Sequence, residues 1–159
     1  MVTALYAGSF DPITYGHLDI IKQGTEIFDK VIVGVAYNPE KQGFLPIGDR
    51  IKLIEACVNG MPNVGLAFYS TLTVEFAKEN NAQVLLRGIR NSSDFEYEKQ
   101  LAEINSKLEP SIKTVFLTAI PEHASVSSSA VRELILHKQN LNLFVPEPAA
   151  EFLYEKFGY

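Results

Sequence analysis

The chain opens on the stretch VTALYAGSFDPITYGH, from Val2 to His17, and this stretch decides the fold class. Its first part, Val2–Ala7, is a nearly continuous apolar run with the length of a strand that is covered on both faces. A polar, glycine-containing loop follows, and the segment His17–Phe28 then repeats apolar residues at helical spacing. A buried strand that passes through a short loop into a helix is the beginning of a β-α-β unit.

The same alternation continues along the chain. Further strands are predicted at Val31–Tyr37, Val64–Phe68, Gln83–Leu86 and Lys113–Leu117, and further helices at Asp49–Asn59, Leu72–Glu79, Ser93–Leu108, Ser128–His137 and Ala149–Phe157. Repeated β-α-β order predicts a parallel sheet with right-handed crossovers and helices on both faces. We therefore expect an α/β fold: a single Rossmann-like, doubly wound domain over residues 1–159 with a five-stranded parallel sheet. Pro146 and Pro148 set off the last helix, about residues 149–157, as a candidate appendage.

Composition describes an ordinary globular protein and excludes several classes. Of 159 residues, 47% are apolar and 21% charged, which argues against intrinsic disorder. The net charge of −5, from 14 Lys and Arg against 19 Asp and Glu, argues against a general nucleic-acid binder. It does not argue against a small phosphorylated ligand, because a few cations in one cleft can hold a phosphate on an acidic protein.

Cysteine and hydropathy patterns favour a cytoplasmic location. Cys57 is the only cysteine, which excludes a disulfide scaffold and fits a reducing compartment, and its helix neighbours predict a buried, inert thiol. The longest apolar run, Val31–Tyr37, is far shorter than the roughly 20 residues that a membrane span needs. The first residues also lack the basic and apolar pattern of a secretory signal. We expect no membrane partner.

Polar residues cluster directly after the predicted strands. In doubly wound sheets, ligands bind beyond the carboxyl ends of the strands, where the strand order reverses. The polar segments at those ends are 8–17, 38–41, 70–73, 87–90 and 121–129. The first of them ends at the start of a helix, where free N–H groups and the dipole favour an anion. This arrangement predicts a phosphate-binding site.

Two helix starts carry opposite charge patterns. The segment Ser127–Ser129 opens a helix that has no acid in its first turn and carries Arg132, an arrangement that a bound anion would stabilise. Ser93 followed by Glu96 predicts a capping box at the start of the helix 93–108.

The stripe of Tyr97, Leu101, Ile104 and Leu108 on that helix is interpreted as core or subunit contact.

These loops resemble those of a known family. The run Gly8-Ser9-Phe10-Asp11-Pro12-x-Thr14-x-Gly16-His17 is similar to the T/HxGH signature of nucleotidylyltransferases in the HIGH superfamily, and Ser127-Ser128-Ser129-x-x-Arg132 resembles their second signature. The blocks Arg87–Arg90 and Asp94–Glu98 narrow the resemblance to the bacterial phosphopantetheine adenylyltransferase family, over nearly the whole chain. Ser9 stands where many relatives have Thr, and both residues keep a hydroxyl.

The resemblance implies a specific reaction. An adenylyl group passes from ATP to 4′-phosphopantetheine, giving dephospho-coenzyme A and pyrophosphate, a step of coenzyme A biosynthesis. The acceptor phosphate attacks the α-phosphorus directly and in line, so positioning and charge neutralisation matter more than acid–base chemistry. The resemblance also implies Mg²⁺ as cofactor, for which we assign no protein ligand, and a homohexamer.

The resemblance also assigns residues. His17 is implied as the transition-state stabiliser. ATP contacts are implied for Ser9, Phe10, His17, Gly88, Ile89, Arg90, Glu98, His123, Ala124, Ser125, Val126, Ser127, Ser128 and Ser129. Phosphopantetheine contacts are implied for Ser9, Lys41, Thr73 and Arg87.

Other interpretations stay open on the sequence alone. His17 could be only a helix cap, Lys41 an ordinary loop lysine, and the serine run a plain N-cap. The arginines of segment 87–90 could brace the fold by pairing with Asp94 and Glu98. A rival enzyme of the same superfamily would adenylylate nicotinamide mononucleotide or transfer CMP to a phosphorylated alcohol, and a rival of another class is a non-catalytic nucleotide-binding or flavodoxin-like module. No Walker A or G-x-G-x-x-G motif is present, which disfavours a P-loop NTPase and a dinucleotide oxidoreductase.

Overall fold

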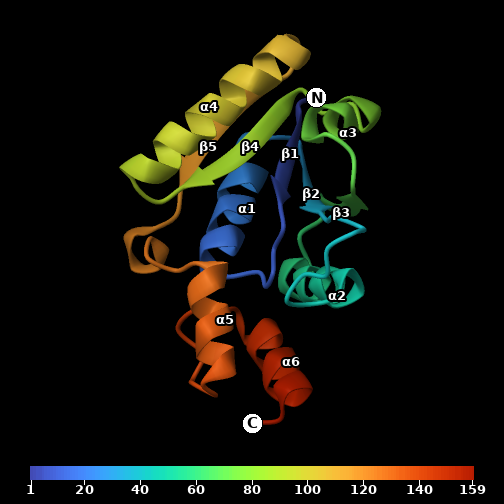
Figure 1. Ribbon diagram of the computed structural model, residues 1–159. Helices are drawn as coiled ribbons and strands as arrows, with labels where there is room; N and C mark the ends of the chain where they lie inside the picture. Colours follow the sequence, from blue (N-terminus) through green and yellow to red (C-terminus); the bar gives the residue numbers. More distant parts are fainter.

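A computed structural model describes all residues, 1–159, and its centre is a parallel sheet (Figure 1). The five strands are β1 (Thr3–Gly8), β2 (Lys30–Ala36), β3 (Val64–Tyr69), β4 (Val84–Ile89) and β5 (Lys113–Thr118). Their order is β3-β2-β1-β4-β5, and every neighbouring pair is parallel. The predicted five-stranded parallel sheet is confirmed.

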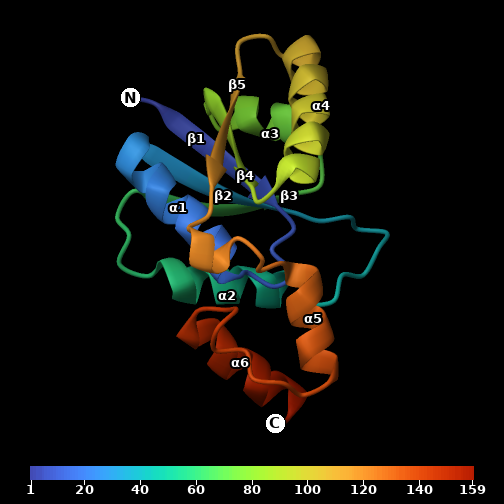
Figure 2. The same ribbon diagram turned by 90° about the vertical axis from the view of Figure 1, so that its left-hand side faces the viewer.

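Helices cover the sheet on both faces, as the apolar strands require. The helices are α1 (Tyr15–Ile27), α2 (Ile47–Val58), α3 (Thr73–Glu79), α4 (Ser92–Leu108), α5 (Ser128–Leu136) and α6 (Glu147–Phe157), with a 3₁₀ turn η1 (Pro121–His123) before α5. Buried residues of α1 and α2 share one cluster with alternate residues of the central strands. A second cluster joins α3 to the opposite face. Figure 2 shows the two layers on either side of the strands.

The strand order reverses between β1 and β4. The chain moves outward from β1 to β2 and β3, then returns to β4 on the other side of β1. The carboxyl ends of these two central strands are Gly8 and Ile89. A doubly wound sheet opens a crevice at such a point, because the loops that follow the two strands diverge to opposite faces.

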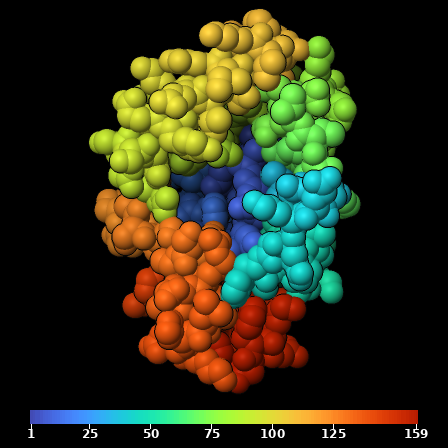
Figure 3. All heavy atoms as spheres, in the orientation of Figure 1, coloured from blue at the N-terminus to red at the C-terminus, as the bar shows by residue number.

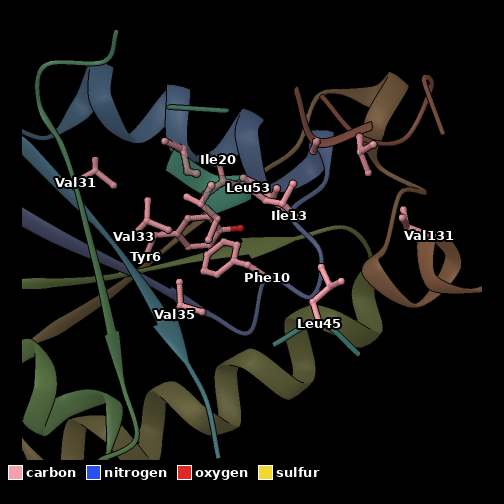
Figure 4. Close-up of a cluster of buried hydrophobic side chains, with 14 of the residues drawn as sticks. Tyr6, Phe10, Ile13, Ile20, Val31, Val33, Val35, Leu45, Leu53 and Val131 are labelled. Carbon is pink, nitrogen blue, oxygen red and sulfur yellow. The ribbon is translucent and has the colours of Figure 1, made fainter. Parts of the chain in front are cut away.

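The main core lies beneath this crevice. Figure 4 shows Tyr6 and Phe10 side by side, with Ile20 and Leu53 from the covering helices around them. Phe10 is 1% exposed and has a φ of 46°, a left-handed conformation that is unfavourable for a bulky residue. Its ring packs edge-on against Tyr6 with centroids 5.2 Å apart, and this burial holds the strained loop in place.

One detail of the predicted helices is wrong. The N-cap of α4 is Asn91, whose side chain accepts a hydrogen bond from the N–H of Asp94, so no capping box forms at Ser93. Asn91 is as good a cap as Ser93, and the geometry with which the chain leaves β4 decides between them. Of the two interpretations of the α4 stripe, the structure excludes core for Tyr97, Ile104 and Leu108, which are all more than half exposed, and subunit contact stays a prediction.

The C-terminal helix is packed into the body. α6 lies against α2, and its residues Ala149, Ala150 and Leu153 are buried in the main cluster. Lys156 forms an ion pair with Asp49 of α2 at 2.8 Å. Residues 149–157 are therefore not a projecting appendage, since their apolar face completes the layer over α2. No helix of the chain combines the length and the apolar character that crossing a membrane requires.

Candidate functional site

A pocket of about 230 Å³ opens at the point where the strand order reverses. Its wall comes from the ends of β1 and β4, the start of α1 and the segment before α5. The lining residues are Tyr6, Ala7, Gly8, Ser9, Thr14, Gly16, His17, Ile20, Arg87, Gly88, Ile89, Arg90, Ala119, Val126, Ser127 and Ser128. Figure 3 shows a hollow here, floored by the blue N-terminal segment and bordered by yellow α4 and orange α5. We call it the switch-point pocket.

A second pocket of about 260 Å³ adjoins the first, between β1 and α4. Thr73, Tyr69 and Leu72 contribute one side of it, and Glu98 and Leu101 of α4 contribute another. Gly8, Ser9 and Arg87 line both pockets. Two ligands bound in these pockets would therefore meet at Ser9 and Arg87. We call the second one the α4 pocket.

His17 is held at the start of α1 by a reciprocal cap. The Thr14 hydroxyl accepts a hydrogen bond from the N–H of His17 at 3.4 Å, and the N–H of Thr14 donates to Nδ1 of His17 at 3.1 Å. Because a backbone N–H only donates, Nδ1 must be unprotonated, and in the neutral ring the proton sits on Nε2. His17 therefore lines the switch-point pocket as a hydrogen-bond donor.

The electrostatics of the pocket keep His17 neutral. Burial lowers the pKa of its imidazole from 6.5 to about 4, and the guanidinium groups of Arg90 and Arg87 add to the effect. An imidazole with this pKa is uncharged at neutral pH. His17 suits the donation of a hydrogen bond to an anion, and it does not suit proton abstraction.

Arg87 forms a bidentate ion pair with Glu98 of α4. Its Nε and Nη2 donate to the two carboxylate oxygens at 2.8 and 2.7 Å, and Nη1 donates to the main-chain oxygen of Ala7. These contacts fix the guanidinium plane between the two pockets. One N–H on each terminal nitrogen stays available, so Arg87 can be braced by Glu98 and still bind a phosphate.

Arg90 pairs with Asp94 at the first turn of α4. Its Nε lies 3.0 Å from Oδ2 of Asp94, which also accepts the main-chain N–H of Arg90 at 3.1 Å. Both arginines of the segment 87–90 therefore pair with acids of the segment 94–98, as one interpretation of the sequence predicted. The pairing coexists with their place in the pocket wall.

The N-terminus of α5 closes the opposite side of the switch-point pocket. Ser127 is the N-cap and accepts the N–H of Ala130 at 3.1 Å, and Ser128 donates to the Pro12 oxygen at 2.8 Å. No acid lies in the first turn. Arg132 is already engaged, because it donates to the Asp11 oxygen at 2.8 Å and to the Ser129 hydroxyl at 3.0 Å. The free N–H groups at this end of α5 favour an anion in the pocket.

The segment before α5 is tied to α1. Asp19 accepts hydrogen bonds from the N–H of Ile120 at 3.3 Å and approaches Nδ1 of His123 at 2.7 Å. The His123 ring also stacks on Tyr15, with centroids 4.8 Å apart and planes at 10°. Neither ring lines the switch-point pocket. Asp19 therefore positions the loop that carries Val126 and Ser127.

The loop after β2 is held at both ends, and at its near end the N–H of Tyr37 donates to the Tyr69 oxygen at 3.0 Å. The Asp11 carboxylate accepts the N–H groups of Phe44 and Leu45 at 2.8 Å each. The buried Arg50 of α2 donates to the Leu45 and Ser9 oxygens, which links this loop to the one after β1. Lys41 precedes the anchor, is exposed, and lines neither pocket.

The predicted residues thus divide into those that meet at a pocket and those that do not. The switch-point pocket is lined by Ser9, His17, Gly88, Ile89, Arg90, Val126, Ser127 and Ser128 of the expected ATP set. Ser9, Thr73 and Arg87 of the expected acceptor set line the α4 pocket, and so does Glu98, which was expected on the ATP side. Phe10, Lys41, His123, Ala124, Ser125 and Ser129 line neither pocket.

Tyr6 and Asp19 are among the residues of this region that were not predicted from the sequence. Tyr6 lines the switch-point pocket from within β1, where a strand pattern counts it as an ordinary apolar residue. Asp19 lies in the first helix, two positions after His17, and its partner follows roughly a hundred residues later. The signal that could have indicated Tyr6 is its hydroxyl, because most of the other side chains of β1 are small or aliphatic.

Cys57 is less enclosed than the buried thiol that the sequence predicts. It is half-buried on α2 and lines neither pocket. Burial raises the pKa of its thiol to about 11, which keeps it protonated and unreactive at neutral pH.

Comparison with known proteins decides the family. The cytidylyltransferase-like family matches residues 5–134. A phosphopantetheine adenylyltransferase from Caldanaerobacter subterraneus subsp. tengcongensis is 47% identical over 157 residues, which is 99% of this chain and 98% of the relative. The chain belongs to the phosphopantetheine adenylyltransferase family. A second member, from Thermosynechococcus vestitus, is 47% identical over 150 residues, covering 94% of this chain and 89% of the relative.

A solved structure agrees with the fold of this adenylyltransferase. It comes from Vibrio parahaemolyticus, and nicotinate-nucleotide adenylyltransferase activity has been suggested for it. The TM-score is 0.67 over 96% of this chain and 99% of that chain, at 19% identity. The likeness therefore concerns the doubly wound fold, and the choice of acceptor is argued from the pockets of this phosphopantetheine adenylyltransferase family member.

Proposed function

We propose that the chain transfers the adenylyl group of ATP to 4′-phosphopantetheine, giving dephospho-coenzyme A and pyrophosphate in coenzyme A biosynthesis. The observation that carries this proposal is the shared wall of the two pockets, formed by Ser9 and Arg87. A transfer between two phosphate-bearing molecules needs their phosphates to meet, and this wall is where they would meet.

ATP is assigned to the switch-point pocket. Arg90, the neutral His17 and the N-terminus of α5 together offer donors and positive charge for the triphosphate. Gly88 and Ile89 at the end of β4 line the pocket beside the nucleotide. The contacts inferred for Ala124, Ser125, Ser129, Phe10 and His123 rest on the resemblance; the Phe10 side chain is buried, so any contact from it would come from its main chain.

4′-Phosphopantetheine is assigned to the α4 pocket. Arg87 would bind its phosphate at the shared wall, and the arm would extend past Thr73 toward Leu72. The Thr73 hydroxyl lies 2.9 Å from the Tyr69 hydroxyl, which fixes its direction. Glu98 serves this side by bracing Arg87. Lys41 is assigned to the same phosphate on the resemblance, and the chain segment that carries it borders the hollow in Figure 3.

The chemistry requires no covalent attachment to the protein. An oxygen of the acceptor phosphate forms a bond to the α-phosphorus as the bond to the bridging oxygen of pyrophosphate breaks, and that oxygen leaves with both bonding electrons. Charge grows on the leaving pyrophosphate. The Nε2–H of His17 and the guanidinium of Arg90, both in the lining of the switch-point pocket, would stabilise that charge, as preorganised donors do when they lower a barrier.

Mg²⁺ is proposed as part of the nucleotide substrate. No group of three or more His, Cys, Asp or Glu side chains could form a protein cage for a metal. The acids nearest the pockets, Glu98 and Asp94, are already paired with arginines. Mg²⁺ would therefore be held by ATP phosphate oxygens and water, a mode that this ion favours.

A homohexamer in the cytoplasm is proposed from the resemblance. Exposed apolar side chains on α4, among them Phe95, Tyr97 and Ile104, are suited to subunit contact. The single cysteine suits a reducing compartment.

The test is direct. The purified chain is incubated with ATP, Mg²⁺ and 4′-phosphopantetheine, and dephospho-coenzyme A and pyrophosphate are measured by mass spectrometry and a coupled assay. Equal amounts of both products are expected. Pantetheine without its phosphate is the matched control and should give none. Transfer to nicotinate mononucleotide in place of 4′-phosphopantetheine would refute the assignment of the acceptor.

A further inference from the structure

Tyr6 is a buried residue whose hydroxyl has no hydrogen-bond partner in the chain and reaches the switch-point pocket. The residue is 5% exposed, and no hydrogen bond joins its oxygen to another residue. Every fully enclosed side-chain polar atom of the chain has a hydrogen-bond partner, so the Tyr6 oxygen is not fully enclosed. The oxygen is therefore the part of Tyr6 that reaches the switch-point pocket. Figure 4 shows it pointing away from Val31 and Val33.

The surroundings fix the direction of this hydroxyl. The Tyr6 ring packs edge-on against Phe10 at 5.2 Å and lies 6.3 Å from the ring of His17. A Cβ placed on Gly88 would lie 3.6 Å from the Tyr6 oxygen, so the missing side chain of Gly88 leaves the hydroxyl uncovered. Tyr6 and His17 thus present polar atoms to the same pocket from a strand and from a helix.

The charges nearby decide what the hydroxyl can bind. Burial raises the pKa of Tyr6 above its ordinary value, which keeps the phenol protonated, and the charges that act on it are those of Arg87, Glu98 and Arg90. A neutral O–H beside two guanidinium groups is a donor in a region built for anions. A phenylalanine would fill the same core space but would offer no donor to the pocket.

We propose that the Tyr6 hydroxyl donates a hydrogen bond to the phosphate chain of the bound nucleotide, next to His17. This inference rests on the proposed function, because it takes the ligand of the switch-point pocket to be ATP. It adds a neutral donor from the floor of the pocket to those of His17, Arg90 and α5. The same phosphate would then be held from the sheet as well as from the two helices.

The test is Tyr6→Phe, with Tyr154→Phe as the matched control. The Tyr154 hydroxyl accepts the N–H of Leu141 at 2.8 Å and lies outside both pockets, so its loss tests stability without touching the site. Calorimetry with Mg·ATP and with adenosine separates the phosphate chain from the base. Tyr6→Phe should weaken ATP binding or lower kcat/KM about ten- to hundredfold, the effect of losing one bond to a charged group, and leave adenosine binding unchanged.

Each outcome bears on the proposal. ATP binding and kcat/KM within twofold of the wild-type values would overturn it, as would an equal loss of affinity for ATP and adenosine. Should Tyr6→Phe fail to fold, 3-fluorotyrosine placed at position 6 alone gives a second readout: its fluorine signal should shift with ATP and not with adenosine, and no shift with ATP would overturn the proposal. A wild-type chain that binds ATP but forms no dephospho-coenzyme A would end the proposed function and leave this comparison readable.

Discussion

The N–H of Thr14 donates to Nδ1 of His17 across 3.1 Å, so the helix cap itself sets the tautomer of the imidazole. His17 therefore takes part in the capping box of α1 and also offers Nε2–H to the pocket. The two jobs are physically linked, because the bond that satisfies the free N–H at the helix start also frees the opposite ring nitrogen for a ligand.

The first prediction concerns the titration of His17. Its pKa in the folded chain is about 4, against an ordinary 6.5, because burial, Arg90 and Arg87 disfavour the imidazolium. Nitrogen NMR of labelled histidine should show the Nε2–H form at pH 7 and a midpoint near pH 4. A midpoint near 6.5 would contradict the neutral-donor role.

The lowered pKa of His17 also makes the free energy of unfolding depend on pH. Between pH 6.5 and 4 the unfolded chain binds a proton at His17 that the folded chain does not, so the free energy of unfolding falls as pH falls through this window. The contribution is fully present above pH 6.5 and amounts to about 3 kcal/mol at most. Urea unfolding at pH 7 and pH 5 should show about 2 kcal/mol of this loss, with His17→Gln as the control that lacks this proton.

The second prediction separates the cap from catalysis. His17→Ala loses the bond to the N–H of Thr14 and should cost about 1 kcal/mol of stability. It should also lower turnover by roughly 10²–10³, the effect of removing one preorganised donor. His17→Gln keeps a cap acceptor at the same helix position, so stability should return while turnover stays low. Turnover that recovered together with stability would show that His17 is only a cap.

The third prediction concerns Arg87 and its partner. Arg87→Ala should abolish binding of 4′-phosphopantetheine and leave ATP affinity nearly intact. It should also cost roughly 3 kcal/mol of stability, because Glu98 is left buried and unpaired. The double variant Arg87→Ala, Glu98→Ala removes that stranded charge.

The double variant distinguishes bracing from binding. Chemical unfolding should show most of the lost stability restored, while calorimetry should still show no acceptor binding. Recovery of acceptor affinity in the double variant would mean that Arg87 only braces α4, and a selective loss of ATP affinity would move Arg87 to the nucleotide side.

The parts of this protein that the sequence predicts well are those with local causes. Continuous apolar runs such as Val31–Tyr37 have few alternatives to a strand covered on both faces, and the β-α-β order then fixes where the strand ends meet. The convergence of His17, Arg87 and Ser127 at one pocket follows from that order.

The errors arise where packing decides among equal local choices. Asn91 and Ser93 are both good caps, and the exit of the chain from β4 selects the first. Glu98 turns toward the α4 pocket because α4 packs over β4 and β5, where Arg87 meets it. The role of the Tyr6 hydroxyl could not be predicted, because a strand pattern indicates that a tyrosine can be buried but not where its hydroxyl points.

The last prediction tests Asp19 as a positioning residue. Asp19 holds Ile120 and His123, and thereby the segment that leads to Ser127 at the pocket wall. Asp19→Ala should let this segment move, and a displacement near 1 Å of groups that contact the nucleotide can cost up to about a hundredfold. Steady-state kinetics should show KM for ATP raised about tenfold or more, with KM for 4′-phosphopantetheine changed by less than twofold.

Glu133→Ala is the matched control for Asp19→Ala. It also removes a carboxylate that is paired with a histidine, because Glu133 lies 3.1 Å from His137 on the exposed face of α5. Equal increases in both KM values, or the same increase in the control, would show a general loss of structure instead of a role for Asp19 in placing the nucleotide loop.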